Sequence, residues 1–274
     1  MKKQIILITG ASSGMGKVTA LQLINEGHIV YGAARRVEAM QELVAAGGHA
    51  LAMDVTQEDQ VHAAVEKIIR EQERIDVLIN NAGFGLYGAV EDISIEEAKY
   101  QFEVNLFGLA RLTQKVLPHM RQQHAGKIIN ISSMGGKIYT PLGAWYHATK
   151  HALEGWSDCL RIEVKSFGID VVIVEPGAIA TAFGDVLTEP MLKRSGSGPY
   201  QKMAKVMASV TTEAYQKKNA LSPPGVIASV IAKAVRSDRP KTRYVAGKMA
   251  RPLMLIRKHL GDRVFDYLLL SRMK

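Results

Sequence analysis

The stretch Thr9-Gly10-Ala11-Ser12-Ser13-Gly14-Met15-Gly16 indicates how this chain of 274 residues folds. It lies between a short apolar run, Ile5–Ile8, and a segment with helical periodicity, Lys17–Asn25. A glycine-rich turn directly after a strand and before a helix is typical of phosphate binding. The spacing is neither the common G-x-G-x-x-G nor a P-loop, because no Gly-Lys-Ser/Thr sequence follows. We therefore expect a phosphate-binding turn of a less common spacing.

The glycines of this turn have separate roles. Gly10 permits a tight turn, Gly14 lets the backbone approach a phosphate, and Gly16 allows close contact between helix and strand. The N-terminus of the helix offers unpaired N–H groups and a partial positive charge to a pyrophosphate. We expect a dinucleotide to contact the turn at Gly10, Ser12, Ser13, Gly14, Met15 and Gly16.

The same pattern, a short apolar run followed by a helical segment, recurs along the chain. The runs are rich in Ile and Val and do not alternate with polar residues, as expected for strands buried on both faces. They are Ile5–Ile8, His28–Ala33, Ala50–Met53, Val77–Ile79, Lys127–Ile131 and Asp170–Val174. The helical segments are Lys17–Asn25, Val37–Ala46, Glu58–Glu73, the region after Glu96, and Trp145–Phe167. Strands that alternate with helices predict an α/β fold with a parallel sheet.

The rhythm changes after Pro176. Thr188–Tyr200 contains two prolines and two glycines, so we predict a mobile loop there. Further helices are predicted at Gln201–Lys218 and Pro224–Val235, a strand at Arg243–Ala246, and one helix with a single apolar face at Leu253–Leu270. We expect one domain over residues 1–274, with a cofactor-binding and catalytic core (1–183) and a substrate lid with a basic extension (184–274).

The charge of the chain is concentrated in that extension. The 35 Lys and Arg exceed the 26 Asp and Glu, which gives a formal net charge of +9. Residues 191–274 contain 18 Lys and Arg but only four Asp and Glu. The first interpretation is a solvated extension that faces another subunit, and the second is contact with an anionic membrane through Arg251, Arg257, Lys258 and Arg263. Nucleic acid is disfavoured as a partner.

A single cysteine, Cys159, excludes an internal disulfide and a multi-cysteine metal site, and we predict it to be a small buried hydrophobe. No metal site is predicted. Lys2 and Lys3 precede an apolar run far shorter than the ~7–15 residues of a signal peptide's core. No run approaches the ~20 apolar residues of a membrane-spanning helix. We expect a soluble, cytoplasmic protein.

The end of the second predicted strand indicates the cofactor. The sequence there reads Ala33-Ala34-Arg35-Arg36, without an acidic residue. In dinucleotide-binding folds an acid at this place accepts from the ribose 2′-OH of NAD, whereas an Arg accommodates the 2′-phosphate of NADP. A guanidinium binds phosphate through forked, charge-assisted hydrogen bonds. We predict NADP(H), held by Arg35 and Arg36, with NAD(H) as the alternative.

A tyrosine, a lysine and a serine are the candidate catalytic groups. Tyr146 and Lys150 lie four residues apart in a helical pattern, so they share one face. Tyrosine has a pKa near 10, and an ammonium group beside it should lower that value. Ser132 and Ser133 end the strand that leads into this helix, at the edge of the sheet where ligands gather. Their hydroxyls could hold a substrate carbonyl oxygen against the tyrosine.

With these residues in place, the chain resembles the short-chain dehydrogenase/reductase family over roughly residues 4–183. The match rests on residues in the family's order and spacing: Thr9–Gly16, Asp54-Val55, Asn80-Asn81-Ala82-Gly83, Asn105, Ser133, Tyr146-x-x-x-Lys150 and Pro176-Gly177-x-x-x-Thr181. The resemblance implies a Rossmann-type fold: a doubly wound parallel sheet with helices on both faces, here with a C-terminal lid and helical extension. It also implies a homodimer or homotetramer.

The resemblance further implies a role for each matched residue. Tyr146 would be the general acid in reduction and the base in oxidation, Lys150 would lower its pKa and bind ribose, and Ser133 would orient the substrate oxygen. Asn105 would hold a water that connects Lys150 to solvent. The remaining matched residues would contact the cofactor: Asp54, Val55, Asn81, Ala82, Gly83, Pro176, Gly177, Ile179 and Thr181. One departure matters, because NADP-using relatives often carry a basic residue where this chain has Ser13.

The substrate is expected to be an apolar ketone, aldehyde or secondary alcohol, so the protein would be a carbonyl reductase or alcohol dehydrogenase. Phe183, Val186, Leu187, Met191 and Leu192 could form an apolar lid. Further possible neighbours of the substrate are Phe84, Leu86, Met134, Trp145 and Trp156. The region from Ser132 through Lys150 is loosely similar to hydroxysteroid and retinol dehydrogenases. The alternatives are a non-catalytic, NADP-sensing protein and a membrane-associated lipid or steroid dehydrogenase.

Overall fold

A parallel sheet forms the centre of the molecule. The computed structural model describes residues 3–181 and 183–271, with Phe183, Asp185 and Val186 described by their backbone alone. Within these residues seven strands pair in the order β3-β2-β1-β4-β5-β6-β7, and every pair is parallel. The strands are β1 (Ile5–Thr9), β2 (Ile29–Ala34), β3 (His49–Ala52), β4 (Val77–Asn80), β5 (Gly126–Ile131), β6 (Ile169–Pro176) and β7 (Arg243–Ala246). The predicted parallel sheet is confirmed.

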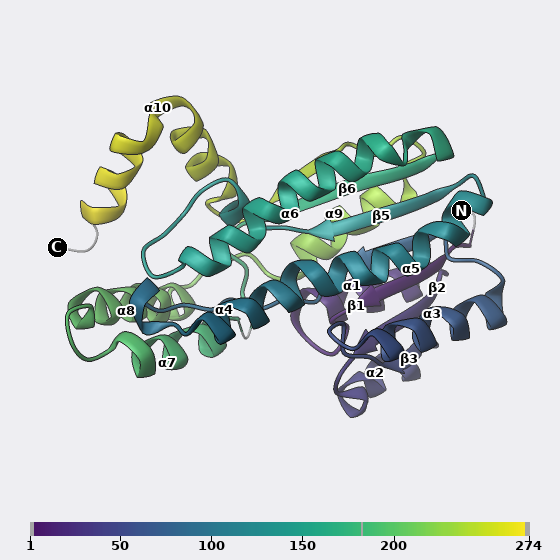
Figure 1. Cartoon of the computed structure of the whole chain (residues 1–274), viewed down its shortest axis with the longest axis horizontal. Coiled ribbons are helices and arrows are strands. Elements are labelled where there is room, and N and C mark those ends of the chain that lie inside the picture. The colour runs from purple at the N-terminus through teal and green to yellow at the C-terminus, as the bar shows by residue number, and fades with distance from the viewer. Residues whose placement is uncertain (1–2, 182, 272–274) are drawn as a thin grey trace.

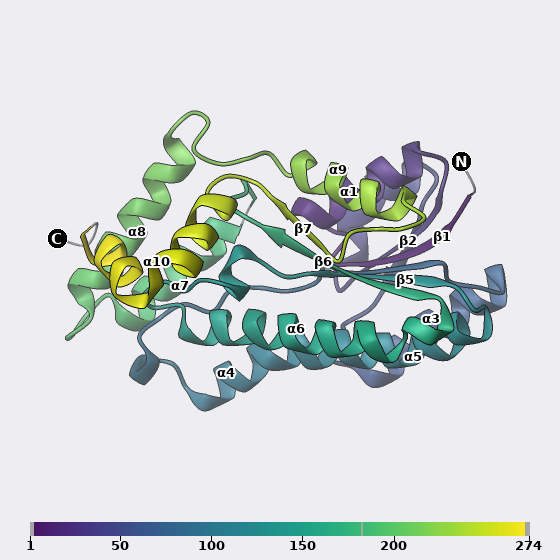
Figure 2. The ribbon, with the colours of Figure 1, turned by 90° about the horizontal axis from the view of Figure 1, so that it is seen from above.

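Apolar side chains cover both faces of the sheet. In β1, Ile5 and Leu7 belong to one core, and Ile6 and Ile8 belong to the core on the opposite face. The first core is closed by α3 (Glu58–Gln72), α5 (Gly108–Gln122) and α6 (Ala144–Glu163). The second is closed by α1 (Gly14–Asn25), α2 (Gln41–Ala45) and α9 (Gly225–Arg236). Figures 1 and 2 show these two helical layers, and the predicted Rossmann-type, doubly wound fold is confirmed.

Shorter helical elements connect the main ones. α4 (Ile95–Phe102) begins with a capping box, in which Ser94 and Glu97 satisfy each other's backbone N–H groups. It continues through a π-helical segment, η3 (Glu103–Phe107), into α5. Over residues 3–181 and 183–271, four short 3-10 turns complete the connections: η1 (Val37–Met40), η2 (Val90–Asp92), η4 (Met134–Gly136) and η5 (Lys165–Phe167).

The loop predicted at Thr188–Tyr200 is wrong over most of its length. Residues Phe183–Ser195 form α7, with Pro190 inside the helix, and Gln201–Gln216 form α8. Leu187 and Met191 are buried in one cluster with apolar residues of α8, and this burial outweighs the hydrogen bond that Pro190 removes. Only the last part of the predicted loop, residues 196–200 with both glycines and Pro199, lies in a turn between the helices.

The single apolar face predicted for Leu253–Leu270 is also wrong. α10 (Ala250–Ser271) is broken at Gly261, whose φ of 74° lies in the left-handed region. After the break Phe265 turns inward and packs on Tyr139 of the loop after β5, with ring centroids 5.3 Å apart. Val264 and Tyr267 stay exposed. α10 is therefore two helical segments, and exposed apolar side chains lie both before the break, at Leu260, and after it, at Val264 and Tyr267.

Cys159 is exposed, contrary to the prediction that it is buried. The buried side of α6 follows Leu153, Ser157 and Leu160 at helical spacing, and Cys159 falls outside that row. Among the helices of the described ranges, none has the length and apolar character needed to cross a membrane.

The sheet order creates the place where a ligand can bind. β1 lies between β2 and β4, and the chain leaves β1 toward one face and β4 toward the other. In such sheets the loops at the carboxyl ends of these two strands diverge and leave a crevice. The glycine turn follows β1, and Asn81 follows β4, so both lie at this crevice.

Candidate active site

The glycine turn has the conformation that its sequence predicts. Gly10 has a φ of 68°, and a Cβ there would lie 2.8 Å from Nδ2 of Asn81. Gly14 begins α1 with a φ of 54°. A methyl group on Gly16 would overlap the carbonyl oxygen of Gly10, so the helix can approach the strand only with glycine at this position. Ser13 precedes the helix in an extended conformation and makes no side-chain cap, which leaves the N-terminus of α1 available to a ligand.

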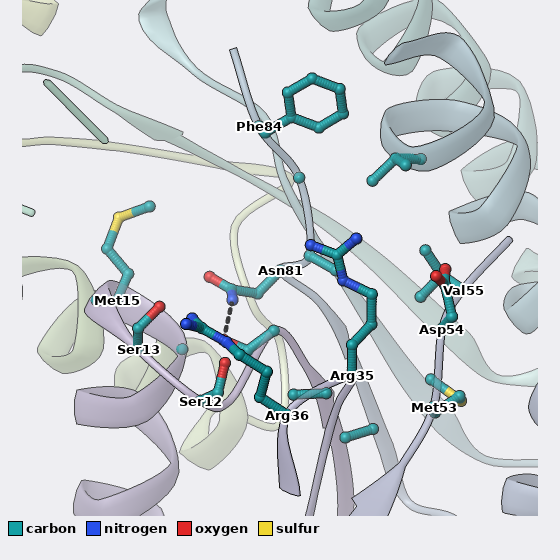
Figure 3. A pocket seen from close by; sticks show the side chains of 18 of the residues that line it. Ser12, Ser13, Met15, Arg35, Arg36, Met53, Asp54, Val55, Asn81 and Phe84 are labelled. Carbon is teal, nitrogen blue, oxygen red and sulfur yellow. Dashed lines mark hydrogen bonds between the residues drawn. The ribbon is translucent and has the colours of Figure 1, made fainter. Parts of the chain in front are cut away.

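Asn81 fixes the turn from the neighbouring strand. Its amide nitrogen donates to the carbonyl oxygen of Thr9 at 2.9 Å and to that of Gly10 at 3.3 Å. The hydroxyl of Thr9 in turn accepts from the backbone N–H groups of Asn81 and Ala82. Figure 3 shows the hydrogen bond that runs from Asn81 to the turn next to Ser12.

A cavity of about 560 Å³ opens in front of this turn (Figure 3). It brings together most of the residues predicted to bind a dinucleotide: Gly10, Ser12, Ser13, Gly14, Met15, Gly16, Arg35, Arg36, Asp54, Val55, Asn81, Ala82, Gly83 and Thr181. The cavity has further lining residues that the sequence did not indicate, among them Met53, Tyr100 and Val104. Their positions follow β3 and lie on α4 and η3, and no sequence motif marks them.

Two arginines and no acid stand at the end of β2. Arg35 and Arg36 both line the cavity, and Figure 3 shows their guanidinium groups on either side of Asn81. Nη1 of Arg35 donates to the hydroxyl of Tyr100 at 3.4 Å. The nearby carboxylate of Asp54 accepts from the backbone N–H and the hydroxyl of Thr56, each at 2.9 Å. The β2 end of the cavity therefore presents positive charge.

The predicted catalytic residues lie on neighbouring elements. Tyr146 and Lys150 belong to α6, and Ser133 precedes η4 at the end of β5. The hydroxyls of Tyr146 and Ser133 share a hydrogen bond. Lys150 is buried, and its Nζ donates to the carbonyl oxygen of Ile131 at 2.9 Å. These three side chains thus meet at the carboxyl edge of β5.

Asn105 lies in the π-helical segment between α4 and α5. Its Oδ1 accepts from the backbone N–H of Phe84 at 3.0 Å, and its Nδ2 donates to the carbonyl oxygen of Phe84 at 2.9 Å and to the hydroxyl of Thr149 at 3.1 Å. A Cβ on Gly83 would lie 3.0 Å from Oδ1 of Asn105 and 3.9 Å from Nζ of Lys150. π-Helical segments are frequent at functional sites.

Burial controls the protonation of this group. It lowers the pKa of Lys150 to about 8, partly offset by the carboxylate of Glu154. Burial raises the pKa of Tyr146, and the hydrogen bond from Ser133 partly offsets that rise. The prediction named the ammonium group of Lys150 as the main influence on the pKa of Tyr146, whereas the structure shows that the cost of removing the phenolate from water dominates.

The segment after β6 is placed in two parts. Thr181 lines the cavity, whereas Pro176, Gly177 and Ile179 are not among its lining residues. Gly177 donates to the carbonyl oxygen of Ala246 at 2.8 Å, and Ile179 packs on the core between the sheet and α9. These residues therefore join β6 to the end of β7.

An apolar lid covers Tyr146. The cluster contains Leu187 and Met191 as predicted, with Leu192 packed against it. It also contains residues that the sequence did not reveal: Tyr87, Leu142, Tyr200, Met203 and Met207. Because they come from separate loops and from α8, only tertiary packing brings them to the tyrosine. Phe183 and Val186 were also predicted here, and their side chains lie outside the described part of the chain.

Other predicted substrate neighbours lie elsewhere. Trp156 packs on the core between the sheet and the α3–α5–α6 layer. Leu86 belongs to a small cluster with Ile93 and Ala98, against which Phe84 and Trp145 pack. Phe84 also lines the large cavity. The prediction is therefore wrong for Trp156, because its position on α6 faces the core of the sheet.

The lid is attached to the body of the protein at both ends. The hydroxyl of Tyr215 in α8 donates to the carbonyl oxygen of Thr181 at 2.7 Å and accepts from the N–H of Gly184 at 2.9 Å. At the other end of α7, Arg194 forms a salt bridge with Glu97 of α4 at 2.7 Å. The apolar surface over Tyr146 is thus held by polar contacts at its margins.

A buried charge cluster lies one helical turn beyond Lys150. Glu154 accepts from Lys137 at 2.8 Å and from Arg243 at 3.1 Å. Glu175, the residue before Pro176, is 1% exposed and lies 3.5 Å from Nε of Arg243. Burial, followed by repulsion from Glu154, raises the pKa of Glu175 to about 7. The cluster ties α6, β6, β7 and the loop after η4 together.

Comparisons with known proteins agree with this arrangement. The family model for short chain dehydrogenases matches residues 4–191. The chain is 40% identical over 270 residues to a 3-ketodihydrosphingosine reductase of Bacteroides thetaiotaomicron, covering 98% of this chain and 97% of the relative. It is 33% identical over 265 residues to the oxidoreductase YbbO of Escherichia coli, covering 96% and 93% of the two chains.

Solved structures give the same result. A short-chain dehydrogenase from Streptomyces avermitilis superposes with a TM-score of 0.80 at 34% identity, covering 97% of this chain and 96% of that one. A serine dehydrogenase in complex with NADP+ superposes with a TM-score of 0.77 at 26% identity, covering 89% and 94%. The chain therefore belongs to the short-chain dehydrogenase/reductase family of oxidoreductases.

Proposed function

We propose that the protein transfers a hydride between NADP(H) and an apolar ketone, aldehyde or secondary alcohol, with Tyr146 as general acid and base. The observation that carries this proposal is the hydrogen-bonded pair Tyr146–Ser133 beneath the apolar lid, next to a dinucleotide-sized cavity. The related enzyme named 3-ketodihydrosphingosine reductase supports a keto substrate. The reaction class is EC 1.1.1.-.

The residues of the cavity fit NADP(H). The close approach of Gly16 to Gly10 and the positive φ of Gly14 leave the backbone bare where a pyrophosphate would meet the start of α1. Arg35 and Arg36 supply charge for a 2′-phosphate at the end of β2. Family relatives have been solved with NADP. NAD(H) is the alternative cofactor, since Ser13 occupies the position where a second basic residue would strengthen the preference.

In the proposed mechanism each residue acts on a proton or a hydrogen bond. When bound at the cavity, NADP(H) would supply or accept the hydride at the substrate carbonyl carbon. Ser133 donates to the carbonyl oxygen and holds it beside Tyr146, whose hydroxyl then gives that oxygen its proton. The ammonium group of Lys150 stabilises the resulting phenolate. Asn105 would hold a water that connects Lys150 to solvent, so that the proton of Tyr146 can be restored. In alcohol oxidation the same protons move in reverse.

An NADPH-oxidation screen tests this function. The panel contains apolar ketones and aldehydes, including 3-ketodihydrosphingosine, and Tyr146→Phe is the control because it keeps the ring and removes the proton. We expect turnover with apolar carbonyl compounds and a loss of about 10²–10⁴-fold in the variant, the usual contribution of a positioned acid. Wild-type activity in Tyr146→Phe would refute the mechanism. Normal NADPH binding without turnover over the whole panel would favour a non-catalytic NADP-sensing protein.

We also propose that the exposed face of α10 contacts an anionic membrane. Val264 is 41%, Leu260 56% and Tyr267 71% exposed on this helix. The two acids of α10 are engaged, because Asp262 pairs with Arg257 and Asp266 accepts from Tyr139. The exposed cations Arg251, Lys258 and Arg263 lie on the same helix. A contact between two copies through this face would bring like charges together, whereas an anionic bilayer complements them.

We propose further that residues 1–274 form one unit and that it assembles as a homodimer or homotetramer, as is typical of the family. The first point is supported by β7, which extends the sheet, and by α9, which packs on the core shared with α1. The second is supported by Phe107 and Ile162, which are 53% and 71% exposed.

A further inference from the structure

His147, the residue after the catalytic tyrosine, is almost completely enclosed. Its side chain lies in α6 with 6% of the residue exposed. A Cβ on Gly135 would lie 3.0 Å from its Nδ1, and a Cβ on Gly143 would lie 2.8 Å from its Cδ2. The rings of Tyr146 and Tyr87 meet it edge-on, at centroid distances of 5.5 and 6.3 Å. The imidazole is therefore held between two glycines and two tyrosines.

Two hydrogen bonds determine which ring nitrogen carries the proton. Nε2 lies 3.0 Å from the backbone nitrogen of Thr140, and an N–H group can only donate, so Nε2 must accept. Nδ1 lies 2.9 Å from the carbonyl oxygen of Gly135, which can only accept, so Nδ1 must donate. Both contacts require the neutral ring with its proton on Nδ1. A proton on Nε2 would oppose the N–H group of Thr140.

These two hydrogen bonds connect the segments that carry Ser133, Thr140 and Tyr146, whose relative positions determine the geometry of the site. The N–H of Gly135 donates to the hydroxyl oxygen of Ser133 at 2.9 Å, and that hydroxyl shares a hydrogen bond with Tyr146. The hydroxyl of Thr140 lies 3.0 Å from Nε2 of His147, and Thr140 also hydrogen-bonds to Tyr87 of the apolar cluster. His147 is thus the link between the Ser133 turn, the loop Lys137–Leu142 and the helix of Tyr146.

We propose that His147 is a positioning residue, which in its neutral Nδ1–H form holds Ser133 and the loop Lys137–Leu142 in place against Tyr146. It touches no reacting atom. Its protonation removes the acceptor for Thr140, so the acid limb of the activity profile is set by His147. Burial lowers the pKa of His147 and keeps the ring neutral near pH 7, although hydrogen bonds to the backbone of Gly135 and Ile138 partly offset this effect. The titratable groups that face it are His151 on the same helix, Tyr146, and Tyr87 from the loop after β4.

The sign of the pH effect follows from the direction of this shift. Because the folded pKa lies below the ordinary value near 6.5, the folded form binds fewer protons than the unfolded chain. The ordered loop is therefore favoured above that value and is lost as the pH falls below it. Activity that depends on the loop should decline on the acid side, although Tyr146 as proton donor stays protonated there.

The first test needs no substitution. A nitrogen-15 NMR spectrum of the wild-type protein with labelled histidine distinguishes protonated from unprotonated ring nitrogens. We expect His147 to show a protonated Nδ1 and an unprotonated Nε2 at pH 7.5, with loss of this signature on acidification. The resonance is assigned by its absence in His147→Gln. An Nε2–H tautomer, or a charged ring at pH 7.5, would overturn the proposal whether or not a substrate has been found.

The second test is kinetic and rests on the proposed function. His147→Leu should lower kcat by about 10- to 100-fold, as expected when catalytic groups are misplaced by about 1 Å, with NADPH affinity nearly unchanged. His147→Gln offers an uncharged acceptor to Thr140, and should recover part of kcat while losing the acid limb. His151→Asn is the matched control, because His151 is exposed on the same helix. An acid limb that persists in His147→Gln would contradict the proposal.

Discussion

Cofactor preference offers the most direct test of the site, through the variant Arg35→Ala. Arg35 follows β2 and lines the cavity, and its Nη1 donates to the hydroxyl of Tyr100 at 3.4 Å. A hydrogen bond to a charged group contributes about 1.5–3 kcal/mol, which corresponds to a factor of roughly 10–150 in the dissociation constant. Because Arg35 is exposed, screening by solvent places the expected loss near the lower end, about tenfold for NADPH.

NADH lacks the 2′-phosphate, so its affinity should change by less than about threefold in the same variant. Fluorescence titration of NADPH and NADH measures both dissociation constants without a substrate. Arg36→Ala is the matched comparison at the next position, and Tyr100→Phe removes only the hydroxyl that Arg35 contacts. We expect a smaller effect in Tyr100→Phe, in the same direction.

The two cofactors must respond differently for the argument to stand. Equal losses for NADPH and NADH in Arg35→Ala would mean that Arg35 supports the cavity wall and does not recognise the 2′-phosphate. Salt provides a second check, because NADPH binding should weaken with ionic strength in the wild type and less steeply in the variant. A wild-type protein that binds NADH as tightly as NADPH would also refute the assignment.

Three further predictions follow from single observations. Gly16→Ala should abolish NADPH binding and lower Tm, because the added methyl group overlaps Gly10. Gly155→Ala is the control, since a Cβ there meets no atom within 4 Å, and it should raise the free energy of unfolding by about 0.5–1 kcal/mol. Equal Tm changes in the two variants would contradict this prediction. Wild-type stability should fall as the pH rises from the ordinary Glu pKa of 4.5 through the raised pKa of Glu175, about 7, so the Tm of Glu175→Gln should increasingly exceed that of the wild type over this range. A Tm difference between the two proteins that does not change with pH would contradict this prediction. The protein should co-sediment with vesicles that contain phosphatidylglycerol but not with vesicles of phosphatidylcholine alone, and Val264→Asp should reduce this binding. If the wild type is instead a dimer without lipid and Val264→Asp dissociates it, the exposed face of α10 binds a second copy of the chain.

Much of the cofactor site could be predicted because its determinants are local. The turn Thr9–Gly16 specifies its own conformation, since Gly10 and Gly14 adopt positive φ values that other residues rarely tolerate. The apolar runs specify buried strands, and the helical crossovers between parallel strands bring the carboxyl ends of the strands to one edge of the sheet. Arg35 and Arg36 then arrive at the cavity by position alone, because they directly follow β2.

The lid and the environment of the catalytic tyrosine could not be predicted in this way. Pro190 and the neighbouring glycines indicated a loop. Residues Phe183–Ser195 are nevertheless helical, because Leu187 and Met191 are buried against α8. The break of α10 at Gly261 likewise depends on where Phe265 can pack. In each case contacts between distant segments outweigh the local preference of the chain.

The sequence by itself determined the sheet, the glycine turn, the arginine pair and the spacing of Tyr146 and Lys150. Only the tertiary structure decided that burial dominates the pKa of Tyr146 and that the apolar lid packs against this tyrosine. The tertiary structure also decided that His147 joins the Ser133 turn to Thr140. The physical reason is that backbone conformation and periodicity are properties of neighbouring residues. Desolvation and hydrogen-bond partnership depend on atoms that the chain brings together only when it has folded.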